Sequence, residues 1–148
     1  MTVLRHAALR QLALEVLTQR AGSARGGEAL AAAARSTYDD LVRVCSPLIG
    51  QAGVEALTAR ALRLAQQEFP WLVDAGEPGP ANEPFVPVLE RLARQDPAVA
   101  TEGAAAVFAM LVGLLVTFIG EPLTASVMRK AWPEAAQSDV HDVHEEEM

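Results

Sequence analysis

One uninterrupted apolar stretch, Ala104–Ile119, constrains the fold of this chain more than any other feature of its sequence. It reads AAAVFAMLVGLLVTFI, contains no charged residue, and has Thr117 as its only polar side chain. A helix that is apolar on every face has to be surrounded, either by other helices or by lipid. Which of these surrounds it decides between a helical bundle and a membrane protein.

The length and the flanks of this stretch favour a bundle. Its 16 residues rise about 24 Å as a helix, whereas the apolar core of a bilayer is about 30 Å thick. Glu102 and Glu121 flank it, and the first basic residue after it is Arg129, so a basic anchor is missing on one side and distant on the other. We predict a buried central helix, with a membrane span at 104–119 as the alternative. Gly113 within it predicts the close approach of another helix.

The composition predicts an all-α fold. Alanine and leucine dominate, aromatic residues make up 5% of the chain, and runs of β-branched residues are absent; this favours helix over sheet. A chain of 148 residues is long enough to bury one core. We predict a single-domain bundle of five or six helices in residues 1–133, wrapped around a central helix at about 98–119. The segments expected to be helical are 2–20, 28–45, 47–69, 85–95, 98–119 and 122–131.

Glycine and proline mark the expected helix ends. Ser46–Pro47 predicts a break and a new helix start, because serine caps helices and proline suits their first turn. Asp96–Pro97 repeats this pattern before the central helix. Gly120 is expected to end the central helix in the left-handed conformation. Residues 73–84 are too rich in proline for helix or central strand and predict a long loop, either functional or a spacer.

Two stretches of the chain resemble each other. Leu48-Ile49-Gly50 precedes a helix that ends in Phe-Pro-Trp, and Phe118-Ile119-Gly120 precedes one that ends in Trp-Pro. Repeated helix-start and helix-stop signals explain this, and a duplicated half-bundle is the alternative. The segments PLIGQAGVEALTARAL and FIGEPLT also give the chain a general resemblance to small bacterial helical proteins, from which we carry over no functional residue.

The charge is concentrated at the C-terminus. The net charge is −7, and residues 134–148 hold six acids and no lysine or arginine, which leaves the rest at −1. We expect 134–148 to be a flexible acidic tail. No basic stripe is present, so nucleic-acid binding is not expected. The single cysteine, Cys45, permits no intrachain disulfide, and the N-terminus lacks a signal-peptide pattern. Both features are compatible with the cytoplasm.

Few residues suggest chemistry, and each has a simpler structural explanation. His141 and His144 stand among acids in the tail and are weak candidates for metal ligands, but a tail with little to hold it predicts no specific metal site. Cys45 is expected to be a packed core residue, because no base is placed beside it. No phosphate loop, His-Glu-x-x-His, Cys-x-x-Cys or Gly-x-Ser-x-Gly motif is present, and we predict no cofactor.

Five residues are weak candidates for contacts with a ligand or partner. Arg60 and Arg63, one turn apart, are able to hold an anion or pair with Glu121, although a solvated helix face and a helix cap explain them as well. Trp71 and Trp132 each adjoin a proline after a helix. They are expected to plug the ends of the bundle, although tryptophan also anchors interfaces.

These observations predict a non-enzymatic interaction or regulatory module that self-associates, most simply as a homodimer. A small-molecule sensor or carrier, with an apolar pocket beside Ala104–Ala106 and Gly113, is the alternative. A membrane-associated protein that uses 104–119 as a span is a further alternative.

Overall fold

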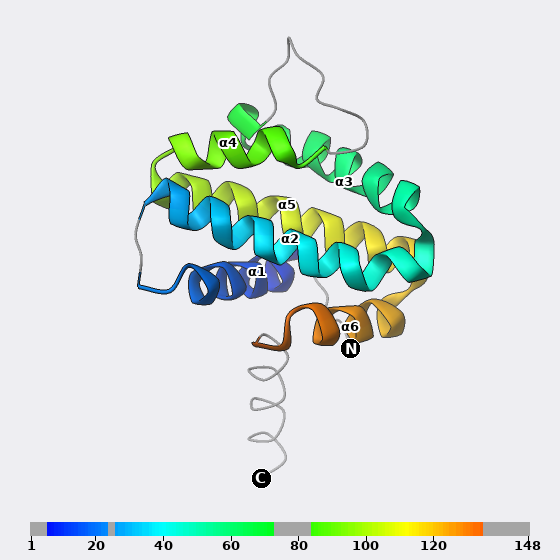
Figure 1. Cartoon of the computed structure of the whole chain (residues 1–148). Helices are drawn as coiled ribbons and strands as arrows, with labels where there is room; N and C mark the ends of the chain where they lie inside the picture. The colour runs from blue at the N-terminus through cyan, green and yellow to red at the C-terminus, as the bar shows by residue number, and fades with distance from the viewer. Residues whose placement is uncertain (1–5, 24–25, 73–83, 135–148) are drawn as a thin grey trace.

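The chain folds as a bundle of helices. The computed structural model describes residues 6–23, 26–72 and 84–134, and these residues form six α-helices and one short 3-10 turn, without a strand among them (Figure 1). The elements are α1 (His6–Ala21), α2 (Gly27–Ile49), α3 (Gln51–Gln66), η1 (Pro70–Leu72), α4 (Val86–Arg94), α5 (Pro97–Ile119) and α6 (Glu121–Ala131). This confirms the predicted all-α bundle. Most of the expected loop at 73–84, and the tail from residue 135 onward, lie outside the described residues.

Helix α5 is the hub of the bundle, as its apolar sequence predicts. Each of the other five α-helices packs against it, and its middle, from Gly103 to Ala109, is buried on every side. Asp96 caps its start, since the Asp96 carboxylate accepts a hydrogen bond from the Ala98 amide at 2.9 Å, as the Asp-Pro pattern indicates. The helix that has no polar face thus packs against every other α-helix of the described chain, as its neighbour α2 also does.

A row of aromatic rings connects four parts of the core. Tyr38 of α2 stacks on Phe85, which precedes α4, with ring centroids 4.5 Å apart. Phe85 lies 5.6 Å from Phe108 of α5, which meets Trp132 edge-on at 5.9 Å. Because aromatic pairs at these distances add to the stability gained from burial, this row ties α2, α4, α5 and the end of α6 together.

The break predicted at Ser46–Pro47 is wrong. Helix α2 continues through Pro47 to Ile49, and the chain turns at Gly50 instead. Pro47 lies in the last turn of α2, where its missing N–H leaves the carbonyl of Arg43, an exposed residue, without a helical donor. A carbonyl near an exposed helix end is satisfied by water, so the cost that proline carries inside a helix is reduced here.

Gly50 and Gly120 form the same kind of corner. Gly50 has φ 83° and ψ 154°, and Gly120 has φ 92° and ψ 158°. Both have positive φ, but neither is in the left-handed helical region predicted for Gly120, because ψ is extended rather than near 47°. Only glycine adopts such a conformation without strain, so each glycine ends one helix and begins the next without a loop.

The two corners belong to matching halves of the bundle. Helices α2 and α5 each have 23 residues and lie side by side, with both glycine corners at the right-hand end of Figure 1. Helix α1 packs on α5 and α4 packs on α2; likewise α3 packs on α5 and α6 packs on α2. Each half therefore lays its first and third helices on the central helix of the other half.

The burial pattern repeats along with the packing. Gly120 follows Gly50 by 70 residues, and the same shift carries every buried residue of α2 onto a buried residue of α5. The pairs are Leu30 and Ala100, Ala33 and Gly103, Ala34 and Ala104, Thr37 and Val107, Leu41 and Leu111, and Cys45 and Leu115. This correspondence favours a duplicated half-bundle over coincidental helix signals.

Arg20 fastens the end of α1 to the end of α6. Its guanidinium donates to the Asp40 carboxylate at 2.8 Å and to the Glu134 carboxylate at 2.9 Å. It also donates to the Ser36 hydroxyl at 2.8 Å and to the Ala131 carbonyl at 3.1 Å. Since the Arg20 side chain is 12% exposed, this set of hydrogen bonds joins three helices in a largely buried position.

Candidate functional site

The arginines and the glutamate predicted from sequence do not form a common pocket. Arg60 and Arg63 are exposed on α3, and Glu121 is half-buried in the first turn of α6. No ion pair joins either arginine to Glu121 in the described part of the chain. The two arginines lie on a solvated helix face, and Glu121 lies at the positive end of α6, where an acidic residue is favoured.

The two tryptophans close the core. Trp132 is 1% exposed, and its indole N–H donates to the Thr37 carbonyl of α2 at 3.1 Å. Trp71 is half-buried in η1, and its ring lies directly over Gly103 of α5, where it would be 2.7 Å from an added Cβ. Gly103 is thus a place where this fold needs a missing side chain, as is Gly27, where an added Cβ would collide with the Ala93 backbone.

Gly113 does not have the close neighbour that the sequence predicts. Among the described residues, a Cβ built there would meet no heavy atom within 4 Å outside its own helix and its chain neighbours. Gly113 lies on a side of α5 that the described helices leave open. We call this side the bare face; its residues are Met110, Gly113, Leu114, Thr117 and Phe118, all half-buried or exposed.

The bare face begins where the cover over α5 ends. Trp71 covers the N-terminal half of α5 at Gly103. Beside it, Arg10 of α1 pairs with Glu68, just after α3, at 2.7 Å, and the charge of Glu102 on α5 also acts on Arg10. Toward the C-terminus no residue in the described part of the chain covers Gly113 in this way, and Phe118 is 64% exposed. The bare face is therefore an apolar surface at one end of the hub helix.

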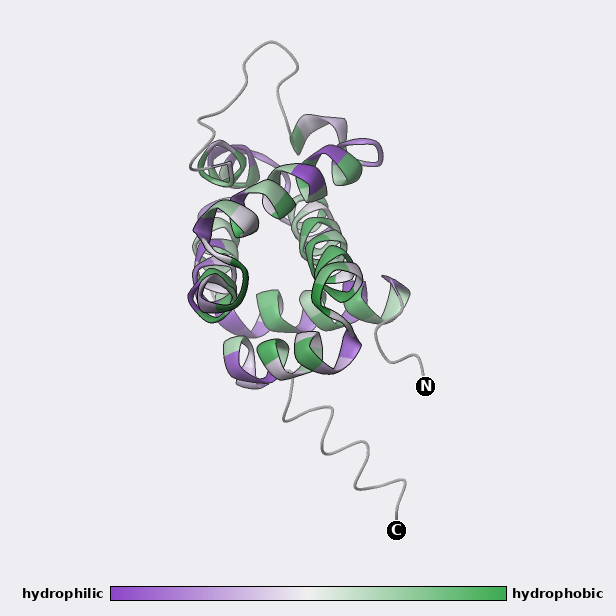
Figure 2. Cartoon of the chain, turned by 90° about the vertical axis from the view of Figure 1, so that its right-hand side faces the viewer, coloured by the Kyte–Doolittle hydropathy of each residue, from purple (hydrophilic) through white to green (hydrophobic). Residues whose placement is uncertain are grey.

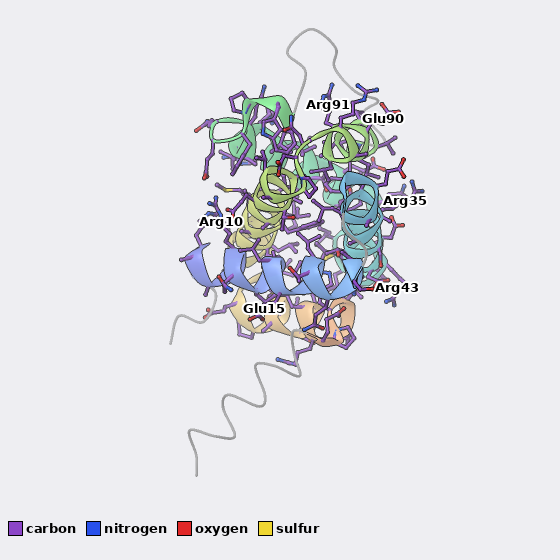
Figure 3. All side chains as sticks on the ribbon, turned by 90° about the vertical axis from the view of Figure 1, so that its left-hand side faces the viewer. Arg10, Glu15, Arg35, Arg43, Glu90 and Arg91 are labelled. Atoms are coloured by element: carbon purple, nitrogen blue, oxygen red, sulfur yellow. The ribbon has the colours of Figure 1, made fainter. Side chains whose placement is uncertain are left out.

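In the other half of the protein, two of the five positions that correspond to the bare face are charged. Seventy residues before the bare face, the corresponding residues of α2 are Asp40, Arg43, Val44, Pro47 and Leu48. Arg43 and Asp40 face each other at 3.6 Å, and Figure 3 shows Arg35 and Arg43 on the outer side of α2. In Figure 2 the ribbon of α5 is green nearly all round, whereas α2 carries purple residues. The bare face occupies the corresponding position on α5 but contains no charged residue.

The two glycines of α5 provide a direct test of this description. We expect Gly113→Ala to raise the free energy of unfolding by about 1 kcal/mol, because alanine favours helix and the space is empty. We expect Gly103→Ala to leave the protein about 1–3 kcal/mol less stable than Gly113→Ala, since the methyl group would collide with Trp71. Urea denaturation followed by circular dichroism measures both; equal stabilities would contradict the open and covered halves of α5.

A cavity lies on the other side of the bundle, between α2, α3 and α4. Its volume is about 220 Å³. Its floor is formed by Tyr38, Val42, Val54, Phe85 and Leu89, and its rim by Arg35, Asp39, Gln51, Glu55 and Val86. The predicted pocket beside Ala104–Ala106 is not this cavity, because those alanines are at most 1% exposed within the packed core.

Cys45 is a packed core residue, as the sequence predicts. It is 2% exposed, and burial raises the pKa of its thiol to about 11. The thiol is therefore protonated at neutral pH, whereas a cysteine nucleophile acts as the thiolate. No group of three or more metal-ligating side chains occurs within residues 6–23, 26–72 and 84–134, and the weak candidates His141 and His144 lie outside those ranges.

Comparison with known proteins adds no relative to this description. The chain matched no protein-family model, no curated protein and no solved structure.

The sequence contains a signal for the bare face, but it becomes visible only when the two halves are compared. The stretch Ala104–Ile119 is uncharged throughout, which by itself predicts that every side of it is covered. Alignment with the residues 70 positions earlier shows that Met110 and Gly113 of the bare face replace Asp40 and Arg43 of α2. The buried Ala105 and Ala109 replace Arg35 and Asp39 in the same way, so the structure is needed to tell the exposed face from the buried one. The cavity has no such signal, since its floor and rim come from three helices.

Proposed function

We propose that this protein is a non-enzymatic helical module that self-associates through the bare face of α5. The observation that carries this proposal is an uncharged, partly exposed helix face at a position where the matching half has Asp40 and Arg43. An exposed apolar strip on a soluble protein commonly marks an interaction site. The lone buried Cys45 is compatible with the cytoplasm as the proposed setting.

A second copy of the chain is the occupant that suits this face best. The face has no charge, so it offers nothing that would select a charged partner, and it is complementary to itself in polarity. Gly113, with empty space over it, allows two α5 helices to approach closely across a two-fold axis, in the manner of small-residue helix pairs. One helix face is smaller than a standard interface of about 800 Å² per partner, so we expect a weak, concentration-dependent dimer.

A membrane role for α5 has weaker support. Within the described residues, α5 is long and apolar enough to cross a bilayer, but 56% of its most apolar window is buried inside the bundle. To span a membrane, α5 would have to separate from the five helices that pack against it. Core helices of soluble proteins have the same length and composition.

The decisive experiment places a charge in the bare face. We expect Phe118→Glu to give monomers at all concentrations, because pairing would bury the new carboxylate without a partner. The wild type should shift from monomer to dimer as its concentration rises, measured by size-exclusion chromatography with light scattering. The matched control is Leu48→Glu, 48% exposed at the corresponding position of α2, which should dimerise like the wild type.

A second variant separates association from folding. Gly113→Leu places its Cβ where no described atom lies within 4 Å, and its side chain would hold a second helix away from α5. We expect it to keep the thermal stability of the monomer and to lose the dimer. A wild type that stays monomeric at high concentration would refute self-association, and binding of the wild type, but not Phe118→Glu, to phosphatidylcholine vesicles would reassign the bare face to lipid.

A further inference from the structure

The cavity between α2, α3 and α4 has an aromatic floor. The rings of Tyr38 and Phe85 are 4.5 Å apart and nearly parallel, with 19° between their planes, and Val42, Val54 and Leu89 complete the floor. A cavity of about 150 Å³ lined by apolar side chains is sufficient to bind benzene. The 220 Å³ here has room for one ring and a short polar arm.

Two carboxylates stand over this floor on different helices. Asp39 belongs to α2 and Glu55 to α3, and both line the cavity. Burial raises the pKa of the Tyr38 hydroxyl; its hydrogen bond with Thr58 lowers this pKa, and the charges of Glu55 and Asp39 raise it further. Both carboxylates therefore act on the same polar atom at the edge of the floor.

A cationic ligand can replace the partners that the Asp39 and Glu55 carboxylates have within the protein. Arg35 approaches Asp39 at 3.6 Å, and both side chains are more than 60% exposed. Glu55 accepts a hydrogen bond from the neutral Gln51 amide at 3.1 Å. Charged donors form stronger hydrogen bonds with carboxylates than neutral ones, and a cation beside an aromatic ring is also attracted to its face.

The matching half of the bundle has no charged residue at the positions of Arg35 and Asp39. Helix α1 packs on α5, and its counterpart α4 packs on α2. The positions on α5 that correspond to Arg35 and Asp39 are Ala105 and Ala109, at most 1% exposed. The same positions are therefore packed core on α5 and a charged cavity rim on α2.

From this arrangement we infer that the cavity is a binding site for a small organic cation: an amine attached to an aromatic or aliphatic body of about one ring. The apolar body lies on Tyr38 and Phe85, and the ammonium group lies between Asp39 and Glu55. This site is separate from the bare face of α5 and does not depend on self-association.

Three probes with one shared ring test the inference. Benzylamine, benzyl alcohol and benzoate differ at neutral pH only in a positive, neutral or negative arm. We expect benzylamine to shift the backbone amide signals of α2, α3 and α4 in two-dimensional NMR titrations. It should bind about ten-fold more tightly than benzyl alcohol, because of the charge-assisted hydrogen bonds, and benzoate should not bind.

Three variants locate the site. Glu55→Gln should weaken benzylamine binding about ten-fold, whereas Glu15→Gln, on α1, a helix that does not line the cavity (Figure 3), removes the same charge and should have no effect. Val86→Trp, from a residue 40% exposed at the rim, should fill the cavity and abolish binding of every probe. Equal affinity for all three probes, no binding at all, or equal effects of Glu15→Gln and Glu55→Gln would overturn the inference.

Discussion

Replacing Trp132 by alanine is expected to lower the free energy of unfolding by about 3–5 kcal/mol, a larger loss than we expect from truncating Trp71 or Arg20. The indole is 1% exposed, meets Phe108 edge-on, and donates its N–H to the Thr37 carbonyl of α2. Truncation would leave a cavity where the row of aromatic rings ends. Urea denaturation followed by circular dichroism at 222 nm measures the loss without relying on tryptophan fluorescence.

Trp132→Phe and Trp71→Ala are the controls for this prediction. Phenylalanine keeps one ring against Phe108 and loses the hydrogen bond and the rest of the indole, so it should cost about 1–2 kcal/mol, less than alanine. Trp71 is half-buried over Gly103, so its truncation should cost less than that of Trp132. A loss below about 1 kcal/mol for Trp132→Ala would show that the end of α6 is not part of the core.

Replacing Arg20 by methionine is expected to lower the free energy of unfolding by about 2–3 kcal/mol at pH 7, between the values for exposed and for buried ion pairs. Methionine keeps the aliphatic stem but leaves the Asp40 and Glu134 carboxylates, 35% and 24% exposed, without their shared partner. Arg20→Lys should recover only part of the loss, since a lysine cannot reproduce the planar fork of donors. Thermal or urea denaturation of both variants checks this order.

The ion pair between Arg20 and Glu134 should make part of the free energy of unfolding depend on pH. Burial alone would raise the pKa of the Glu134 carboxyl, but the hydrogen bonds and charge of Arg20 outweigh it and lower that pKa. A carboxyl whose pKa is lowered on folding stabilises the fold above its unfolded pKa of about 4.3 and stops doing so in acid. The difference between wild type and Arg20→Met should therefore shrink as the pH falls through the lowered pKa. A difference that stays constant into acid would show that Glu134 contributes nothing.

The predictions for Trp132 and Arg20 concern contacts between the two halves of the bundle. Trp132 follows α6 and is inserted against α2, and Arg20 ends α1 and holds the end of α6. Each half packs its outer helices on the central helix of the other, so the halves are interlocked. We therefore expect the described helices to unfold in one transition.

Local signals in the sequence determined much of this architecture. The uncharged stretch Ala104–Ile119 predicted the hub, because a helix without a polar face gains most from being surrounded. Asp96 before a proline predicted the cap of α5, and Gly120 predicted its end, since both depend on groups within a few residues. The burial of Cys45 followed from its place on an apolar helix face.

Signals that depend on the environment were less reliable. Ser46–Pro47 reads as a helix break, yet α2 passes through it because the freed carbonyl belongs to an exposed residue near the helix end. Gly103 and Gly113 lie in the same helix, and no local feature states that Trp71 covers the first and that the second is open.

The sequence by itself determined that this protein is helical and which helix lies at its centre, because helix periodicity, caps and apolar runs are short-range properties. Only the tertiary structure decided which side of that helix is covered. The cover depends on which distant segments of the described chain meet α5, such as Trp71 of η1 over Gly103. The bare face and the cavity are both defined by segments far apart in the sequence, and for this reason neither could be recognised from local sequence patterns.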